Sequence, residues 1–385
     1  METYQEASEG QVFPPMNTSP HEVTMFNRYV YLLLSKFSFG KMRKKYAEKE
    51  KLIRRLLAYK ASGLSDEARE RLTTALKTHY FETVLNACYS ETSWIRKNGV
   101  EFFGSEMLRL DFEDHLYRRL NNFRTTVVPW LDSMIPLKNA SVLEIGCGTG
   151  STTVALGEKG AKITAIDVCA ESMQVAKERC RIYGINNVEF QLLNADRMKS
   201  SLTDPFDYVI FTASMEHMTH NERIRSIQAA YELVKENGHV VLLETPNRLW
   251  FADVHTSGDP FFHWLSDECA MDYAQFTPRE SFHFAFEDRA DDSLTKLARW
   301  GRGVSFHEFV IALGGMEKVK VASSMWSFLD RRDYKSFLRK AAHSFFGILG
   351  KGGQNRRYRH FLKQVAPNGI HEGFYAEWLY IALKK

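Results

Sequence analysis

Three glycines at alternate positions could bring a backbone turn directly beneath a bound molecule. They follow the apolar segment from Val142 to Ile145, which has the pattern of a short strand buried on both faces, and Ser151 to Leu156 then begins a helix. The third glycine comes one residue earlier than in the dinucleotide pattern G-x-G-x-x-G, so the spacing argues against a dinucleotide. The three residues are Gly146, Gly148 and Gly150.

Acidic side chains accompany this turn and the two predicted strands that follow it. Glu144 lies two positions before the first glycine, Asp167 ends the segment that starts at Ala161, and Asp196 ends the segment that starts at Val188. A carboxylate such as Asp167 can accept hydrogen bonds from both hydroxyls of a ribose. One carboxylate alone could equally cap a helix or lie in a solvated loop, but three in register favour a ligand site.

The glycine spacing together with these acids resembles motif I and the following strands of class I S-adenosylmethionine (SAM) methyltransferases. The resemblance covers about residues 139–245 strongly and the C-terminal strands weakly. In that family the glycine backbone lies against the methionine and ribose parts of SAM, an acid at the position of Glu144 reaches the amino group, and an acid at the position of Asp196 binds the adenine amino group. The resemblance implies SAM as cofactor and S-adenosylhomocysteine as product, with a binding set of Glu144, Gly146, Cys147, Gly148, Gly150, Asp167, Val168, Asp196, Arg197, Met198 and Thr212.

A histidine follows the fourth predicted strand, in the region toward which the methyl group of SAM points in the resembled family. His217, preceded by Glu216, is the first candidate for a general base that removes a hydroxyl proton, because an imidazole titrates near neutrality. It could instead orient the substrate or cap the next helix. Methyl transfer from a sulfonium needs little beyond in-line approach, so a base is not obligatory.

The loop after the fifth predicted strand contains a rival base, His255. Asp253 lies two residues earlier, so in an extended loop the two side chains share a face and could form a carboxylate-oriented imidazole. The pair could also be structural. A lone D-x-H pair without a third ligand is too common to indicate a metal site, and we predict no metal.

Polar and aromatic residues without an amphipathic period surround His255, as is typical of a binding loop. We predict that the acceptor is bound by Glu216, Asn247, Arg248, Trp250 and His263. The segment from Pro260 to Arg302 is rich in aromatic residues and is either a substrate lid or an ordinary packed insertion.

The elements that must position these residues alternate between strand and helix five times from about Ser141 to Glu244. This alternation predicts a parallel sheet with helices on both faces and ligands at the carboxyl ends of the strands. Gly314 to Ala322 and Phe374 to Leu383 fit the last two strands, which are an antiparallel pair in the resembled family. The predicted fold class is α/β, a Rossmann-like seven-stranded SAM methyltransferase sheet with an N-terminal helical cap domain and helical insertions.

Segments outside the alternating pattern divide the chain further. Residues 1–24 predict an extended arm, and residues 25–126 predict a helical region that either caps the sheet or forms a homodimer surface. Residues 127–385 would be the methyltransferase domain, with a lid insertion at 246–304 and a basic insertion at 325–372. Basic and apolar residues are interleaved in the latter, which suits an anionic lipid surface, a phosphorylated glycan or nucleic acid.

The composition of the 385 residues narrows the class of protein. A hydrophobic content of 44% suffices for a sizeable core, and no apolar run is long enough to span a bilayer. The five cysteines have no paired metal spacing, so we expect free thiols and a cytoplasmic location. The net charge is only +4, and no N-P-P-Y-like motif follows the fourth strand, so a nucleic acid partner is not expected.

From these patterns we expect a SAM-dependent methyltransferase that modifies a hydroxyl or carboxyl oxygen of a small or medium-sized molecule, such as a natural product or glycan, in biosynthesis. One alternative within the fold is carboxyl methylation of a peptide or protein, for which a base is unnecessary. Another is a SAM-binding cyclase or lyase without net methyl transfer. The sequence leaves peripheral contact with an anionic membrane surface and homodimerisation open.

Overall fold

The computed structural model of the protein describes residues 63–86, 113–286, 293–332, 351–366 and 370–385. The chain divides into a unit of Met1–Leu57 and a unit of Ala58–Lys385, and every described residue belongs to the second. The predicted arm at residues 1–24 and most of the predicted helical region therefore lie outside the described residues.

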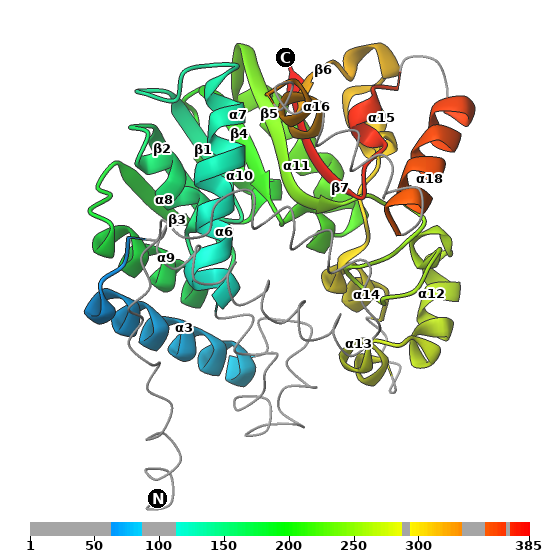
Figure 1. Cartoon of the computed structure of the whole chain (residues 1–385), viewed down its shortest axis with the longest axis horizontal. Helices are drawn as coiled ribbons and strands as arrows, with labels where there is room; N and C mark the ends of the chain where they lie inside the picture. Colours follow the sequence, from blue (N-terminus) through cyan, green and yellow to red (C-terminus); the bar gives the residue numbers. More distant parts are fainter. Residues whose placement is uncertain (1–62, 87–112, 287–292, 333–350, 367–369) are drawn as a thin grey trace, which may run out of the picture. The chain divides into compact units, whose positions relative to one another are not determined.

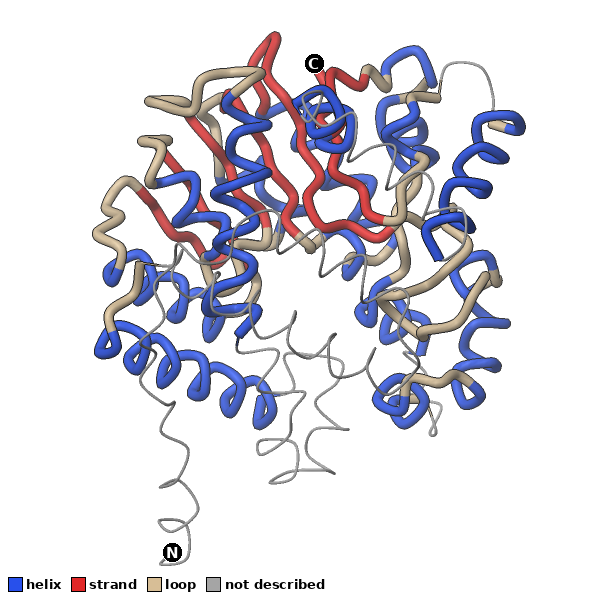
Figure 2. The backbone as a smooth tube through the Cα atoms, in the orientation of Figure 1, coloured by secondary structure: helices blue, strands red, loops and turns tan. Residues whose placement is uncertain are grey.

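One sheet of seven strands forms the centre of the described part, in the order β3-β2-β1-β4-β5-β7-β6 (Figure 2). The neighbouring strands β3, β2, β1, β4 and β5 are parallel, whereas β7 pairs antiparallel with both β5 and β6. This confirms the predicted fold class. The strands are β1 (Ser141–Ile145), β2 (Lys162–Asp167), β3 (Val188–Leu192), β4 (Phe206–Thr212), β5 (Val234–Pro246), β6 (Val321–Ser324) and β7 (Trp378–Lys384).

Helices connect the parallel strands and cover both faces of the sheet (Figure 1). Each parallel crossover needs such a connection, because two parallel strands cannot be joined by a tight hairpin. The helices and short helical turns between β1 and β5 are α8 (Ser151–Gly157), α9 (Ala170–Ile182), η3 (Ala195–Arg197), α10 (Met198–Ser201), η4 (Met215–His217) and α11 (His220–Leu233).

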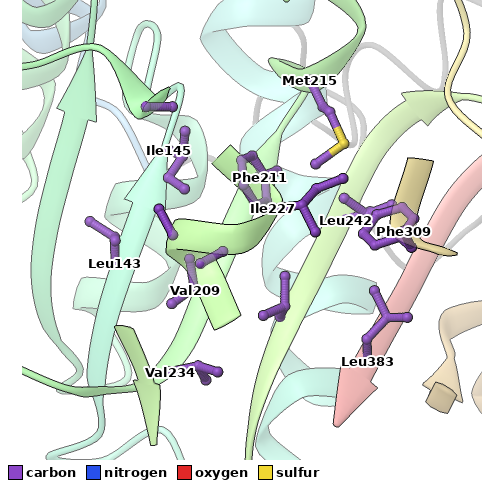
Figure 3. Packing of buried hydrophobic residues seen from close by; sticks show 14 of the residues in the cluster. Leu143, Ile145, Val209, Phe211, Met215, Ile227, Val234, Leu242, Phe309 and Leu383 are labelled. Carbon is purple, nitrogen blue, oxygen red and sulfur yellow. The ribbon is translucent and has the colours of Figure 1, made fainter. Parts of the chain in front are cut away.

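Alternate residues of the central strands enter two separate hydrophobic cores, one on each face of the sheet. Val142 of β1 packs with the core that contains Tyr208, while its neighbour Leu143 packs with the core that contains Val209. Figure 3 shows the core that contains Leu143 and Val209, in which residues from the strands pack against Ile227 of α11. Side chains of a strand point alternately to opposite faces, so a sheet covered on both faces requires the continuous apolar runs in this sequence.

The end of α11 differs from the sequence-based expectation. The Asn237-Gly238 pair predicts a helix end at that point, because both residues readily adopt the left-handed conformation. The helix instead ends at Leu233, and β5 begins at Val234. Val234 pairs with Phe206 of β4 and is buried in the core, so burial of this side chain in the sheet outweighs one more helical turn. Asn237, rather than Gly238, has the left-handed backbone conformation, with φ of 65°.

The helix before β1 runs without a break from Asp114 to Asp132, as η1 (Asp114–Arg118), α6 (Arg119–Asn122), η2 (Phe123–Val127) and α7 (Val128–Asp132). Its buried residues on both sides of position 126 pack in one core with β1 and β4; they include Leu120, Phe123, Val127, Trp130 and Leu131. The domain boundary predicted at residue 126 therefore falls inside a helix that packs on the sheet.

Helix α3 (Asp66–Asn86) is the other described part of the predicted helical region, and it packs against α9. Leu72 and Leu76 share a small core with Val175 of α9, and Arg71 forms an ion pair with Glu178 of the same helix at 2.8 Å. This helix thus packs on α9 and η1.

Two helical insertions follow β5 and β6. The first has its own core around Phe262, Phe282 and Trp300, and includes η5 (Phe262–Trp264), α12 (Asp267–Tyr273), η6 (Ala274–Phe276), α13 (Glu280–Ala285) and α14 (Ser293–Gly301). After it come α15 (Phe306–Leu313), η7 (Met316–Lys318), β6, α16 (Met325–Arg332), α18 (Lys351–Val365), η9 (Glu372–Phe374) and β7. Much of the predicted basic insertion, at residues 333–350 and 367–369, lies outside the described residues.

Among the described helices, none combines the length and apolar character needed to cross a membrane.

Candidate active site

The glycine turn joins the carboxyl end of β1 to the start of α8. The amides of Gly146 and Cys147 both donate to the carbonyl of Ile166 in β2, at 2.9 and 3.2 Å, so the turn is tied to the neighbouring strand. Gly148 has φ of +49°, and a Cβ at this residue would meet no atom within 4 Å. Backbone without a side chain and open space beside it form a surface that a ligand can approach closely.

Asp167, at the end of β2, connects the glycine turn to the next loop. One carboxylate oxygen accepts the amide of Gly148 at 2.8 Å, and the other accepts the amide of Cys169 at 2.9 Å. Burial raises the pKa of Asp167 although these amides lower it. Val168, which lies between Asp167 and Cys169 in the chain, is exposed. The side chain of Cys147, in the glycine turn, is buried.

Glu144 lies beneath the turn with its side chain fully buried. One oxygen accepts the Thr153 hydroxyl at 2.6 Å, and the other has no hydrogen-bond partner among the described residues. Burial raises the pKa of Glu144 to about 7, although the hydrogen bond from Thr153 lowers it. A cationic group beside the free oxygen would favour the ionised form.

Asp196 and Thr212 carry two more buried acceptors at this edge of the sheet. Oδ2 of Asp196 pairs with Arg225 at 2.7 Å, but Oδ1 has no partner among the described residues, and neither has the hydroxyl of Thr212. Near Asp196, Arg197 is exposed, whereas the side chain of Met198 is buried in the core, so only its backbone could contact a ligand.

These observations test whether the edge fits SAM. An unpartnered buried acceptor costs about 1–3 kcal/mol, which a ligand donor would recover. The edge has three such atoms, on Glu144, Asp196 and Thr212, beside the open backbone of Gly148. A ligand with an ammonium, a ribose and an adenine amino group can supply the matching donors, so the residues fit SAM.

A second set of polar groups lies at the carboxyl ends of β4 and β5. Glu216 and His217 belong to η4, which Met215 anchors in the hydrophobic core (Figure 3). His255 comes from the loop after β5, and its ring centroid lies 5.2 Å from that of His217. Ligand atoms of Glu216, His217 and His255 all lie within 4.8 Å of one another.

Burial controls the protonation of this set, named here the Glu-His-His cluster. Burial raises the pKa of Glu216 to about 8, and both of its carboxylate oxygens lack a partner among the described residues. Burial lowers the pKa of His217, and burial followed by the nearby His217 and Arg279 lowers the pKa of His255 to about 3. Both imidazoles are therefore neutral at pH 7.

Comparison with known proteins places this edge in a known family. Residues 142–238 match the methyltransferase domain family. The ubiquinone biosynthesis O-methyltransferase of Paracidovorax citrulli is 29% identical over 132 residues, 34% of this chain and 54% of that protein. The protein of the same name from Pseudomonas aeruginosa is 30% identical over 132 residues, 34% of this chain and 55% of that protein.

Residues 142–238 are a SAM-dependent methyltransferase domain. The chain spans about half the length of the curated relatives that it matches. Among solved structures, a SAM-dependent methyltransferase of Clostridium acetobutylicum aligns with a TM-score of 0.31 and 17% identity, over 37% of this chain and 55% of that one. Haemonchus contortus phosphoethanolamine N-methyltransferase 1 aligns with a TM-score of 0.27 and 23% identity, over 30% and 24%.

In the loop after β5, Asp253 does not orient His255 as the sequence suggested. Its Oδ1 accepts the Nε2–H of His263 at 3.1 Å, and its oxygens also accept the amides of His255, Thr256 and Ser257. Burial raises the pKa of Asp253, but the bonds from His263 and these amides lower it more strongly, to well below its ordinary value. The pairing of Asp253 with the His255 ring is therefore corrected: Asp253 shapes the loop.

Three residues predicted to bind the acceptor support the loop after β5. Asn247 is buried, and its amide donates to the carbonyls of Phe374 and Ala376, both at 2.7 Å. Trp250 is buried against Tyr358 of α18, and His263 is buried on Asp253. These side chains make contacts inside the protein, and their contact with the acceptor stays a prediction. Arg248 remains half-buried, 3.9 Å from Asp267.

Residues near the strand ends that the sequence did not single out also shape the site. His115 of η1 contacts Thr149 of the glycine turn at 2.9 Å, and Arg119 of α6 pairs with Glu244, which has a left-handed φ of 53°. The helix before β1 thus reaches the carboxyl ends of β1 and β5. No local sequence signal marks such contacts, because their partners are distant in the chain.

Arg299 and Gly301 of the first insertion lie against the two histidines of the Glu-His-His cluster. The carbonyl of Arg299 in α14 accepts Nδ1–H of His217 at 2.8 Å. Gly301 has φ of +110°, and a Cβ there would lie 2.4 Å from Cε1 of His255. Only glycine therefore allows the imidazole to pack against this backbone.

Proposed function

We propose that this protein transfers the methyl group of SAM to an oxygen atom of a small or medium-sized acceptor. The methyltransferase domain supports the methyl donor, and the names of the curated relatives support oxygen as the acceptor atom. The observation that carries the proposal is the Glu-His-His cluster at the ends of β4 and β5, on the edge of the sheet that also bears the glycine turn.

SAM, when bound, supplies an electrophilic methyl group: the acceptor oxygen forms a C–O bond as the C–S bond breaks, and S-adenosylhomocysteine is released. The chain's own residues must hold the two reactants in line and provide for the hydroxyl proton. Because Nδ1–H of His217 donates to the carbonyl of Arg299, Nε2 keeps its lone pair. We propose His217 as the proton acceptor and His255 as the group that helps to hold the acceptor oxygen.

The acceptor would lie against the loop after β5 and the first insertion. Arg248, the half-buried residue of the predicted acceptor set, is a candidate for this contact, together with Glu216 of the cluster. Exposed aromatic side chains of the same insertion, such as Phe261 and Trp264, would suit an acceptor with an apolar body.

The test incubates the protein with labelled SAM and a panel of phenols, sugars, carboxylic acids and cell extracts, and measures S-adenosylhomocysteine and methylated products by mass spectrometry. We expect an O-methylated product. Tight SAM binding without S-adenosylhomocysteine from any acceptor would overturn the proposal in favour of a SAM-binding lyase or cyclase.

Substitution of the cluster tests its role separately from cofactor binding. We expect His217→Ala to lower turnover by at least about 100-fold and to change SAM affinity by less than about threefold. His220→Ala is the matched control, because His220 is an exposed histidine on the same segment. Near-normal turnover in both His217→Ala and His255→Ala would show that the cluster does not act in the reaction.

A further inference from the structure

The Glu-His-His cluster contains an acidic group that no described residue satisfies. The Glu216 side chain is fully buried, yet neither carboxylate oxygen has a hydrogen-bond partner among the described residues. Nε2 of His217 lies 4.0 Å from its Oε1. Buried carboxyl groups are normally hydrogen-bonded, paired with a charge or bound to a metal, so this arrangement points to a missing ligand.

The imidazole of His217 is oriented in the way that metal-binding histidines usually are. His217 uses Nδ1 to donate to the backbone carbonyl of Arg299 at 2.8 Å, which leaves the lone pair of Nε2 toward Glu216. The ring of His255 is fixed against the bare backbone of Gly301, and a Cβ on that glycine would also lie 3.5 Å from Cε1 of His217. One backbone segment thus holds both rings in place.

The charges around the cluster do not supply the missing ligand. Arg223 donates to the carbonyl of Glu216 rather than to its carboxylate, and it forms an ion pair with Glu308 at 3.3 Å. Arg299 forms a two-point ion pair with Glu222, with both contacts at 2.7 Å. Both guanidiniums are therefore engaged with other acids and do not contact the Glu216 carboxylate among the described residues.

We propose that Glu216, His217 and His255 bind a divalent transition-metal ion of the zinc class, which holds and activates the acceptor hydroxyl. Two imidazoles and one carboxylate are a donor set that favours zinc and its first-row neighbours over magnesium or calcium, which prefer oxygen ligands. Three protein ligands also leave a coordination position open for a substrate oxygen, as in catalytic rather than structural zinc sites.

The present separations suit such an ion with a small adjustment. Ligand atoms around a tetrahedral zinc ion lie about 3.4 Å apart, given metal–ligand distances of about 2.1 Å. The atoms of the cluster lie within 4.8 Å of one another, so side-chain movements of about 1 Å would close the site.

A metal ion would change how the hydroxyl proton leaves. The acceptor hydroxyl would coordinate the ion and release its proton to solvent, because a bound divalent cation lowers the pKa of an oxygen ligand. The resulting oxyanion would attack the methyl carbon, with the C–O bond forming as the C–S bond breaks. His217 would then act as a ligand rather than as the base. This step rests on the proposed O-methylation, whereas the metal site itself does not.

The experiment uses the full-length protein after removal of metals with a chelator, and adds Co²⁺ as a probe with a visible spectrum. We expect one equivalent to bind and to give the absorption of a four- or five-coordinate ion, with displacement by Zn²⁺. Glu216→Gln, His217→Ala and His255→Ala should each weaken Co²⁺ binding by at least about 100-fold. The control variant His220→Ala should retain it.

SAM binding, measured by calorimetry in each variant, keeps the outcomes distinct and shows that the variants are folded. Absence of a stoichiometric Co²⁺ or Zn²⁺ site in a protein that binds SAM would overturn the inference, as would binding that survives all three substitutions. Methyl transfer that is unaffected by chelation would overturn the activating role of the ion. Metal binding at the cluster without methylation of any acceptor would support the site and contradict the proposed function instead.

Discussion

At the cofactor edge, individual carboxylates differ in how they are satisfied. Asp167 receives backbone amides on both oxygens, while Glu144 and Asp196 each keep one oxygen without a partner among the described residues. The carboxylate oxygens that accept backbone amides fix the shape of the turn. The carboxylate oxygens without a partner are available to a ligand. Two predictions at the scale of single residues follow from this difference.

The first concerns pH and Glu144, whose pKa is raised by burial to about 7. Because the folded pKa is raised, the contribution of Glu144 to stability without ligand is largest below its ordinary value of 4.5 and is lost as the pH rises through about 7. If the ionised form binds the SAM ammonium, SAM affinity should rise between pH 5 and 8. Calorimetric titration across this range measures the SAM affinity. Glu144→Gln should make the affinity independent of pH. An unchanged pH dependence in the variant would contradict the assignment of Glu144 to the SAM ammonium.

The second prediction concerns Asp196, whose free Oδ1 is assigned to the adenine amino group. Asp196→Asn can present its amide NH₂ instead of an acceptor, and we expect a loss of about tenfold in SAM affinity. Arg225→Gln is the control, because it removes the ion pair at 2.7 Å and keeps the carboxylate. Equal losses in both variants, measured by calorimetry, would mean that only the ion pair matters.

At the scale of elements, the contact between the glycine turn and α9 decides how β1, α8 and α9 fit together. Gly150 caps α8 with φ of 82°, and an added Cβ would lie 2.9 Å from both Cα and Cβ of Ala176 in α9. A side chain at this position would therefore separate the two helices or distort the turn beneath the cofactor.

We expect Gly150→Ala to lower the free energy of unfolding by about 2–4 kcal/mol, from left-handed strain and overpacking together. Gly184→Ala is matched in strain, since Gly184 has φ of 68° and no atom within 4 Å of an added Cβ, and should cost about 1–2 kcal/mol. Chemical denaturation measures both. Equal destabilisation of the two variants would refute the packing explanation.

At the scale of the whole molecule, the cofactor edge draws on segments that are distant in the chain. The turn after β1 contacts β2 through Ile166 and the helix before β1 through His115. A ligand that bridges these segments binds the folded state and has no equivalent site in the unfolded chain, so binding must stabilise the whole fold.

We expect SAM at about 100 times its dissociation constant to add about 2.7 kcal/mol of stability and to raise the melting temperature by several degrees. NADH should give no shift, because the glycine spacing departs from the dinucleotide pattern. Thermal unfolding with each ligand measures this. Stabilisation by NADH in the absence of an effect of SAM would reverse the cofactor assignment.

Much of the cofactor edge was predictable from local sequence. The strand before Gly146, the helix after Gly150 and the acids at strand ends are encoded by short-range periodicity and by glycine's freedom to adopt positive φ. The parallel sheet then followed from the alternation of strands and helices. By contrast, the helix that crosses residue 126 is held by packing on the sheet, which no local pattern reveals.

The sequence by itself determined the sheet, the glycine turn and the acids beside that turn, because each depends on residues close together in the chain. Only the tertiary structure decided the acceptor side. It paired Asp253 with His263 instead of His255, and it brought His255 to Glu216 and His217 across neighbouring strand ends. Such contacts depend on which strands lie side by side and which backbone, here Gly301, leaves room for a ring.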